Sequence, residues 1–551
     1  MKIINSIFLT LIASIISISF FAQEGIDKEI IVVKPYVPTL SDAQKINILP
    51  EIKDTVTVKP HFNYIIQPKK FETEYELRPI KAANLIGEPL GKLYKSYLRI
   101  GVGNYLVPLA ELNINSLRSR NQSFGLYLKH TSINGKLKLE NDQKVPVGFN
   151  ENIIRAYGKK IFRKSELSGM LSPGFYGLNF YGYNPVIDTV PDKKDTRQNY
   201  LFSDANLRLQ STHKDSLHLN YNLALDYGFT YDHFKHHEHA IRVSSDMNKL
   251  YKNNVFGLKA GFAHYLTSTS IDSANNTIIQ FNPWFSRTTS EYAYKLGVNF
   301  VADIHGDNTD FFVHPIAFLQ IKVIDKIMIP YFGIEGRLQE NYFGKIVREN
   351  MYILPGLNTA NTNHKINAFI GMKGNYTSRL SYHLNFNYAL VDQMYFFIND
   401  TTDILGNKFI VAYDDIERIN VMGELTYKPG DKLYFILEGN YYRYNLDSLE
   451  YAWHKPQFDM MLYGEYNLQN KILVKGSLFY VGSRYAMNPL LSGDPFKLDG
   501  YLDLSVGLEY RYTKILSGFI QLNNLLGMNQ NPWLFYPSMR FNLLVGFTYA
   551  L

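Results

Sequence analysis

Hydrophobic and polar residues alternate along most of the chain from Leu93 onward. Between Ser216 and Tyr231 every odd position is Leu, Tyr or Phe, whereas the even positions are polar or small. The same period of two recurs in residues 380–390, 502–512 and 541–551. Successive side chains of a β-strand point to opposite faces, so each stretch predicts a strand with one apolar and one polar face.

The length of these stretches separates a membrane barrel from a soluble β-protein. Strands of soluble proteins average about 5–6 residues, whereas a membrane-crossing strand needs about 9–11. The alternating stretches run for 11 to 16 residues. A soluble propeller or solenoid would also need a sequence repeat, and the chain contains none that we can identify. We therefore predict an all-β fold, a transmembrane antiparallel β-barrel of the outer-membrane type.

Short polar connections alternate with longer ones, such as residues 132–150, 182–198, 342–361 and 399–415. Outer-membrane barrels have short periplasmic turns and long external loops. Ten short turns predict about 22 strands, within a range of 16–22, with both barrel ends in the periplasm. The ten turns fall at Arg118–Asn121, Arg163–Glu166, Thr212–Ser216, Tyr251–Asn254, Thr288–Glu291, Asp325–Lys326, Thr377–Arg379, Lys428–Lys432, Gln469–Lys471 and Thr513–Lys514.

The 42 tyrosines and 36 phenylalanines supply nearly all the aromatic residues, and they cluster where strands meet long loops. Amphipathic rings favour the headgroup level of a membrane. Strand propensity alone explains tyrosine in strands but not its clustering, so we predict an outer aromatic girdle. Its clusters are Tyr176–Tyr183, Tyr227–Phe234, Tyr395–Phe397, Tyr441–Tyr444 and Trp533–Tyr536.

The N-terminal part of the chain has a different composition. Residues 1–22 combine Lys2, an apolar run and the small residue Ala22, which predicts a secretory signal peptide; the alternative is an uncleaved anchor. Residues 23–91 hold seven of the 22 prolines. Proline removes backbone donors and blocks helices, which predicts an extended periplasmic arm before a barrel of residues 92–551.

Composition excludes several classes of function. The chain has no cysteine, which excludes disulfides, thiolate metal sites, thiol catalysis and a lipidated N-terminal cysteine. The net charge of +7 is spread out and does not indicate nucleic-acid binding. After residue 22 no run of 18 apolar residues occurs, which excludes helical membrane spans.

Alternation also predicts which charged residues line the lumen. Their simplest role is to pair across strands and keep the lumen hydrophilic, and the more specific role is to select solutes. Because the two signs nearly cancel, we expect no strong ion preference. The predicted lumen-lining residues are Glu335, Arg337, Glu424, Glu438, Glu465, Lys475, Asp503, Glu509 and Arg511.

One histidine-rich segment is the only candidate for metal chemistry. His233, His236, His237 and His239 follow one another closely, and imidazoles with carboxylates suit transition metals. The simpler interpretation is a solvated hairpin loop, so we predict no resident cofactor or metal. His383 and Asn385 share a strand face, but no serine motif accompanies them, and catalysis needs a base beside a nucleophile. We predict that the protein is not an enzyme.

The C-terminal strand predicts the route of assembly. Phe547, Tyr549 and Leu551 alternate into the terminus, as in the final strand that the barrel-assembly machinery reads in outer-membrane proteins. Leu551 stands where the usual terminal residue is aromatic.

Three stretches resemble a known family. Gly518–Gly527 resembles the penultimate strand of TonB-dependent receptors. Lys34–Ala43 and Leu93–Tyr105 resemble plug-less, TonB-dependent-receptor-like barrels of the Bacteroidota. The resemblance implies the outer membrane of a Gram-negative bacterium, contact with outer-membrane lipid and lipopolysaccharide, and a channel or transporter component for solutes.

The chain departs from true TonB-dependent receptors before the barrel. Their plug domain exceeds a hundred residues, whereas only residues 23–90 precede this barrel. Ile30, Ile31, Val32 and Val33 resemble the short box that adds a strand to TonB, or else form an extended segment docking elsewhere. The alternative function is a non-enzymatic structural subunit of a secretion or barrel-assembly machine with periplasmic and surface partners.

Overall fold

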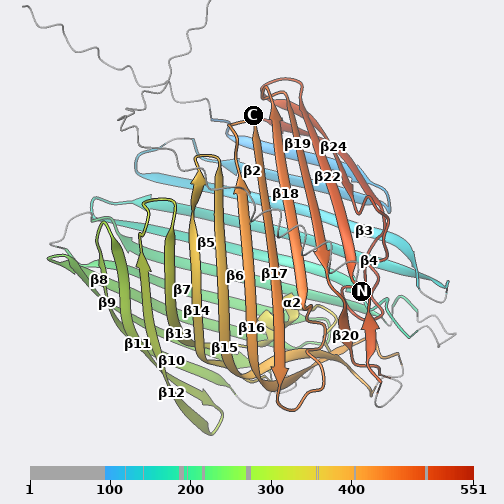
Figure 1. Ribbon diagram of the computed structural model, residues 1–551. Helices are drawn as coiled ribbons and strands as arrows, with labels where there is room; N and C mark the ends of the chain where they lie inside the picture. Colours follow the sequence, from blue (N-terminus) through green and yellow to red (C-terminus); the bar gives the residue numbers. More distant parts are fainter. Residues whose placement is uncertain are drawn as a thin grey trace, which may run out of the picture. The chain divides into compact units, whose positions relative to one another are not determined.

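The computed structural model describes one closed antiparallel barrel of 22 strands (Figure 1). The described residues are 93–551, apart from 118, 140–141, 185–191, 195, 214–217, 269–274, 355–356, 358, 403–404 and 490–493. The prediction of an all-β barrel of about 22 strands is confirmed. The predicted signal peptide, the arm of residues 23–91 and the predicted TonB-binding residues Ile30–Val33 lie outside the described part.

Each barrel strand pairs with its sequence neighbours, and β1 pairs with β24 to close the ring. A small hairpin and one short helix interrupt the order of the strands. The elements are β1 (Ser96–Gly103), β2 (Val107–Asn115), β3 (Gln122–Lys138), β4 (Lys144–Ile161), β5 (Ser165–Asn179), β6 (Arg197–Ser211), β7 (Asn220–Asp232), β8 (His237–Tyr251), β9 (Asn254–Thr267), β10 (Asn276–Thr288), β11 (Tyr292–His305), β12 (Asn308–Ile321), β13 (Ile329–Gln339), α2 (Phe343–Glu349), β14 (Thr362–Thr377), β15 (Leu380–Asn399), β16 (Phe409–Tyr427), β17 (Leu433–Leu446), β18 (Phe458–Leu468), β19 (Ile472–Val481), the hairpin β20 (Arg484–Ala486) and β21 (Phe496–Leu498), β22 (Tyr501–Arg511), β23 (Leu516–Asn523) and β24 (Asn542–Ala550).

The two ends of the barrel differ in their connections. All ten predicted short turns connect strands at the same end, which we call the turn end. The opposite end, which we call the loop end, carries the long connections, including residues 340–361, 482–500 and 524–541. The sequence therefore predicted the alternation of turns and loops correctly.

One predicted loop is largely strand. Residues 132–150 were expected to be a long connection, but β3 and β4 stay paired from Ser132 and Asn150 to Lys138 and Lys144. Polar residues occupy the outward positions of this segment, while its inward positions carry apolar residues such as Leu137, Val145 and Val147, so the period of two continues with the apolar face turned to the lumen. Similarly, the loop expected at 399–415 ends where β16 begins at Phe409.

Large apolar side chains cover the outside of the barrel. Phe300, Ile370 and Val421 lie on different strands and are exposed, while the residues beside them in sequence point to the lumen. An apolar outer surface around a polar lumen is the pattern of a membrane β-barrel. None of the helices in the described residues is long and apolar enough to cross a membrane.

Several predicted girdle clusters point inward instead. Tyr183, Phe397 and Tyr536 are almost fully buried, and they belong to apolar clusters on the lumen side at the loop end. Loops that fold back into the wide lumen place these rings against one another, so packing holds them instead of lipid headgroups. Tyr227 and Tyr441 remain exposed on the outer surface, as the girdle prediction required.

The seam between the first and last strands depends on a close fit. Gly101 of β1 lies opposite Gly546 of β24. The ring of Phe519 from β23 covers both glycines, and the Arg99 guanidinium lies 4.3 Å from the centre of that ring. A Cβ atom at Gly546 would lie 2.1 Å from the Ile100 carbonyl oxygen, so only glycine lets the two strands approach.

We predict that Gly546→Ala weakens barrel closure. The added methyl meets backbone that cannot move without breaking the ladder, and overpacking of this kind costs about 1–3 kcal/mol. The folded fraction after refolding, measured by heat-modifiable migration on gels, should fall. Gly476→Ala is the matched control, because a Cβ there has no neighbour within 4 Å. Equal yields for both variants would contradict the role of the seam.

Candidate functional site: a capped lumen

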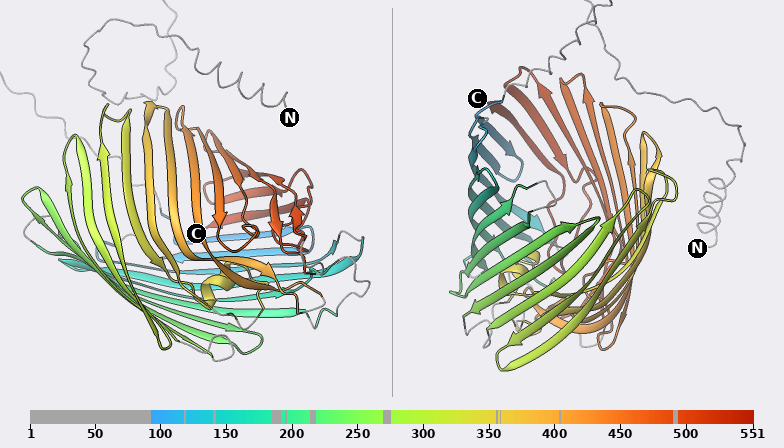
Figure 2. Two further views of the ribbon diagram at one scale, coloured as in Figure 1. Left: turned by 60° about the horizontal axis from the view of Figure 1, so that its bottom comes forward. Right: turned by 90° about the vertical axis from the view of Figure 1, so that its left-hand side faces the viewer.

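Several connections at the loop end pack against one another and against the inner wall of the barrel. We call residues 340–361, 447–457 and 524–541 the cap; the first of these contains α2, which lies within the ring of strands (Figure 2). Apolar side chains of the cap pack in one cluster with Tyr200 of β6 and Phe397 of β15. These strands are nine positions apart in the ring of 22, so the cluster spans the lumen.

A buried carboxylate anchors the start of α2. Glu238 of β8 is 1% exposed and accepts hydrogen bonds from the backbone N–H groups of Phe343 and Gly344, both at 2.8 Å. The first N–H groups of a helix have no partner within the helix. A carboxylate at this end accepts from them, and its negative charge interacts favourably with the helix dipole. At Gly344 a Cβ would lie 2.4 Å from the Thr230 hydroxyl, so glycine permits this close approach.

Ion pairs hold the other end of α2 between two parts of the barrel. Arg348 donates to both carboxylate oxygens of Asp204 on β6 at 2.9 Å and lies over the ring of Phe202. Glu349 accepts from Lys455 at 3.1 Å. The helix therefore connects the β6 wall to the 447–457 connection, and in the first pair the Arg348 Nη2 alone donates to both Asp204 oxygens.

A neutral histidine joins two segments of the cap to the wall strand β15. His454 is buried; its Nδ1 lies 3.0 Å from the Phe397 carbonyl oxygen, and its Nε2 accepts from the Leu534 N–H at 3.4 Å. Burial lowers the pKa of His454 to about 3. The partners fix the proton on Nδ1, so a charged imidazole would lose the bond from Leu534 and bring a charge into the core.

A buried amide network forms the base of the cap. Asn361 donates to Asp303 of β11 at 2.8 Å and exchanges hydrogen bonds with Asn276 of β10. Asn341 donates to the Thr362 hydroxyl and to the Ala360 carbonyl, both at 2.8 Å. Buried polar groups are costly unless paired, so these bonds fix where the connection leaves and rejoins the wall.

The predicted lumen-lining residues all occupy strand positions opposite to the exposed apolar ones. Glu465 pairs with Lys475 at 3.6 Å, and Glu509 pairs with Arg511 at 3.7 Å. Each of the remaining carboxylates lies within 3.5 Å of a polar side chain near it. Those contacts are Glu335 with Asn367, Glu424 with Thr426, Glu438 with Asn440, and Asp503 with Ser505.

Arg337 follows an irregularity in the pairing of β13 with β14 and lies opposite His364. A selective role for any of these lining residues stays a prediction.

Alternation should also have identified the charges of the first four strands, which the prediction missed. Arg99 pairs with Glu111 at 3.5 Å, and Lys129 pairs with Glu151 at 2.6 Å. Glu111 follows Arg99 across the short 104–106 connection, so the signal was present in the sequence.

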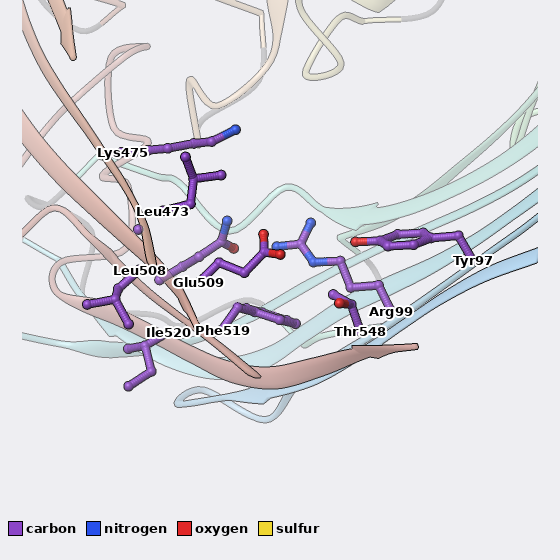
Figure 3. A pocket seen from close by; sticks show the side chains of 11 residues that line it. Tyr97, Arg99, Leu473, Lys475, Leu508, Glu509, Phe519, Ile520 and Thr548 are labelled. Atoms are coloured by element: carbon purple, nitrogen blue, oxygen red, sulfur yellow. The ribbon is translucent and has the colours of Figure 1, made fainter. Parts of the chain in front are cut away.

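A hollow of about 230 Å³ lies beside these charges on the inner wall (Figure 3). Tyr97, Arg99, Glu509 and Lys475 line it from three strands. Carboxylate and cationic groups face the same space, so this wall can contact polar solutes of either sign.

The four clustered histidines do not converge. His237 and His239 project from the outer face of β8, where His239 contacts Tyr227 at 2.8 Å. His236 lies in the turn and contacts Asp232 at 2.9 Å, whereas His233 is exposed. Within the described residues no group of three or more His, Asp or Glu side chains is arranged to hold a metal ion.

The predicted assembly signal lies on the closing strand. Phe547 and Tyr549 project outward from β24, which pairs with β1, and Leu551 is exposed beyond its end. Its recognition by the assembly machinery stays a prediction.

Comparison with known proteins finds solved structures with a similar fold. No model of a known family matches the sequence, and no curated protein matches it either. The ferric-catecholate import receptor Fiu of Escherichia coli K12 has a TM-score of 0.61 at 9% identity, covering 84% of this chain and 82% of that chain. The FrpB iron transporter of Neisseria meningitidis (F5-1 variant) has a TM-score of 0.64 at 10% identity, covering 84% and 83%. The siderophore receptor PirA of Acinetobacter baumannii has a TM-score of 0.64 at 11% identity, covering 84% and 81%.

These neighbours are an import receptor, an iron transporter and a siderophore receptor. At such low identity the similarity shows a common fold. The described part of this chain therefore shares the overall fold of these three proteins.

We predict that acid loosens the cap through His454. The folded pKa of about 3 lies below the ordinary value of about 6.5, so stability is complete above pH 6.5 and is lost as the pH falls toward 3. The equilibrium constant for local opening of residues 533–536 should increase about tenfold for each pH unit below 6.5. Hydrogen exchange of these residues, corrected for the intrinsic exchange rate, measures this constant.

His454→Asn tests the cause of this pH dependence. Asparagine keeps a donor toward Phe397, tolerates the φ of 59° at this position, and does not titrate. The variant should lose the pH dependence, and an unchanged slope would assign it to another group.

Proposed function

We propose that this chain is an outer-membrane receptor-type transporter component that passes a solute when its cap moves. The observation that carries the proposal is a 22-strand barrel in which loop-end connections pack together inside the ring, above a wall of charged residues. Its likeness in fold to import receptors supports the same reading. A barrel of this size leaves space for solutes once the cap is displaced.

We infer that the loop end faces the cell exterior and the turn end faces the periplasm of a Gram-negative bacterium. The apolar outer surface supports contact with outer-membrane lipid, and the long loops support this orientation. The signal peptide 1–22, the barrel-assembly machinery as a partner in folding, and TonB as a partner through Ile30–Val33 belong to this proposal. No catalytic step is part of it.

The contacts of α2 give the direct test of a movable cap. Glu238→Ala leaves two buried N–H groups without an acceptor, which costs about 1–3 kcal/mol, and Arg348→Ala removes the ion pair with Asp204. The double variant should open the cap in a larger fraction of molecules, by roughly tenfold for each 1.4 kcal/mol. Liposome swelling with small sugars should be slow for the wild type and several-fold faster for the variant.

Glu424→Gln is the control, because this inward carboxylate lies on β16 and contacts only Thr426 among the hydrogen bonds described for it. It should swell like the wild type. A correctly folded double variant that passes no solute would count against a movable cap over an open lumen.

A structural role in a larger outer-membrane assembly is the second candidate. The observation that favours it is the cap itself, which is packed like a protein core from opposite walls of the barrel. Under this proposal the barrel stays closed and holds periplasmic and surface subunits.

Isolation in mild detergent from native membranes separates the two functions. If the chain is a transporter, we expect the wild type to copurify with TonB, its proposed energy-coupling partner. A fixed stoichiometric complex of secretion or assembly subunits, together with a barrel that stays impermeable in the double variant, would instead establish the structural role.

A further inference from the structure

The outer wall of β3 to β6 changes character between the turn end and the loop end. On the turn side the outward residues are apolar, as at Ile154, Leu171 and Phe175, all of which are exposed. Toward the loop end the outward positions become Ser, Asn, Gly and Lys. The strands therefore continue past the apolar surface and present a polar outer wall directly beside it.

The register places the polar residues in two adjacent rows. Ser132, Asn150, Gly177 and Asn199 lie opposite one another across four strands. One step closer to the loop end, Asn134 lies opposite Gly148, and Asn179 lies opposite Arg197. One step closer to the turn end, Phe175 lies opposite Leu201 on β5 and β6, and both are exposed and apolar, whereas the same row on β3 and β4 still holds the polar pair His130 and Asn152.

A hollow of about 440 Å³ opens over these rows. Residues 192–194 form its rim, because the buried Asn179 amide donates to the Lys193 carbonyl at 3.1 Å. A Cβ at Gly148 would lie 2.5 Å from Asn179 Oδ1, and a Cβ at Gly177 would lie 2.4 Å from Asn150 Nδ2. The two glycines therefore leave room for the amides that form the floor.

The chemistry of the hollow is that of a phosphorylated saccharide site. Lys193, Lys194 and Arg197 contribute three cations, against one carboxylate from Asp192. Cations bind phosphate through charge-assisted hydrogen bonds, and amides donate to and accept from sugar hydroxyls. An occupant that enters from the outer surface would also touch Phe175 and Leu201 with any apolar part.

We propose that this hollow binds the phosphorylated sugar headgroup of an anionic glycolipid in the outer leaflet, whose acyl chains lie along the adjacent apolar wall. The proposal rests on the outer-membrane location and not on transport. The polar hollow matches the phosphorylated sugar headgroup of such a lipid, and the adjacent apolar wall matches its acyl chains. A soluble phosphosugar would use the cations and amides but would leave the apolar side chains uncovered.

The test uses the purified full chain in phosphatidylcholine nanodiscs with and without diphosphorylated lipid A. Lipid A should slow hydrogen exchange in residues 192–199 several-fold. Lys194→Glu combined with Arg197→Glu should weaken this protection about tenfold, because two charge-assisted contacts become repulsive. Lys497→Glu, an exposed loop-end lysine on β21 outside the hollow, should behave like the wild type.

Three outcomes overturn the proposal. Protection by soluble glucosamine phosphate at the same strength would assign the hollow to a free phosphosugar. Equal protection in the double charge variant, or none in the wild type, would remove the site. Glycolipid binding is read out in folded protein already inserted in a bilayer, so its failure is distinct from a failure of solute passage in the swelling assay.

Discussion

The structure depends on closing one continuous backbone ladder. A sheet edge facing lipid would leave a row of N–H and C=O groups without partners, so membrane strands must end in a closed ring. The pairing of β1 with β24 is therefore the contact on which the other strands rely. Gly101 and Gly546 allow that approach, and Phe519 fills the space that the missing side chains leave on the lumen side. The closed ring fixes which face of every strand points outward. The direction of each side chain in turn decides whether it contacts lipid, the lumen or the cap.

A ring of 22 strands encloses more space than its own side chains fill, and the cap uses that space. Polar contacts at both ends of α2 hold it: the buried Glu238 at the first turn and the exposed ion pair of Arg348 at the last. His454 adds a neutral buried contact between the connections. Each is a polar contact at the edge of an aromatic cluster, so the cluster supplies the stability and the polar groups fix its position.

The sequence predicted the barrel well because its signals are local. Strand alternation, the ten short turns and the inward position of residues such as Glu465 and Asp503 follow from the period of two. The cap could not be predicted in the same way, because Tyr200 and Phe397 are nearly two hundred residues apart in sequence. Local pattern places Tyr183 and Tyr536 at the ends of strands but does not decide whether each ring meets lipid or the lumen. Glu238 lay inside the histidine-rich segment, and nothing in its neighbours indicates a helix cap more than a hundred residues away.

The contacts of the cap also bear on the order in which the chain folds. Tyr181 donates to the Pro537 carbonyl across 356 residues, and Asn104 donates to the Phe541 carbonyl across 437 residues. Contacts of such sequence separation form only after the intervening chain is in place, because closing a long loop costs entropy first. Contacts between the first and last parts of the chain can therefore form only once the whole wall of strands exists. The packing inside the ring is in this sense a record of completion, because it joins parts of the chain made first to parts made last.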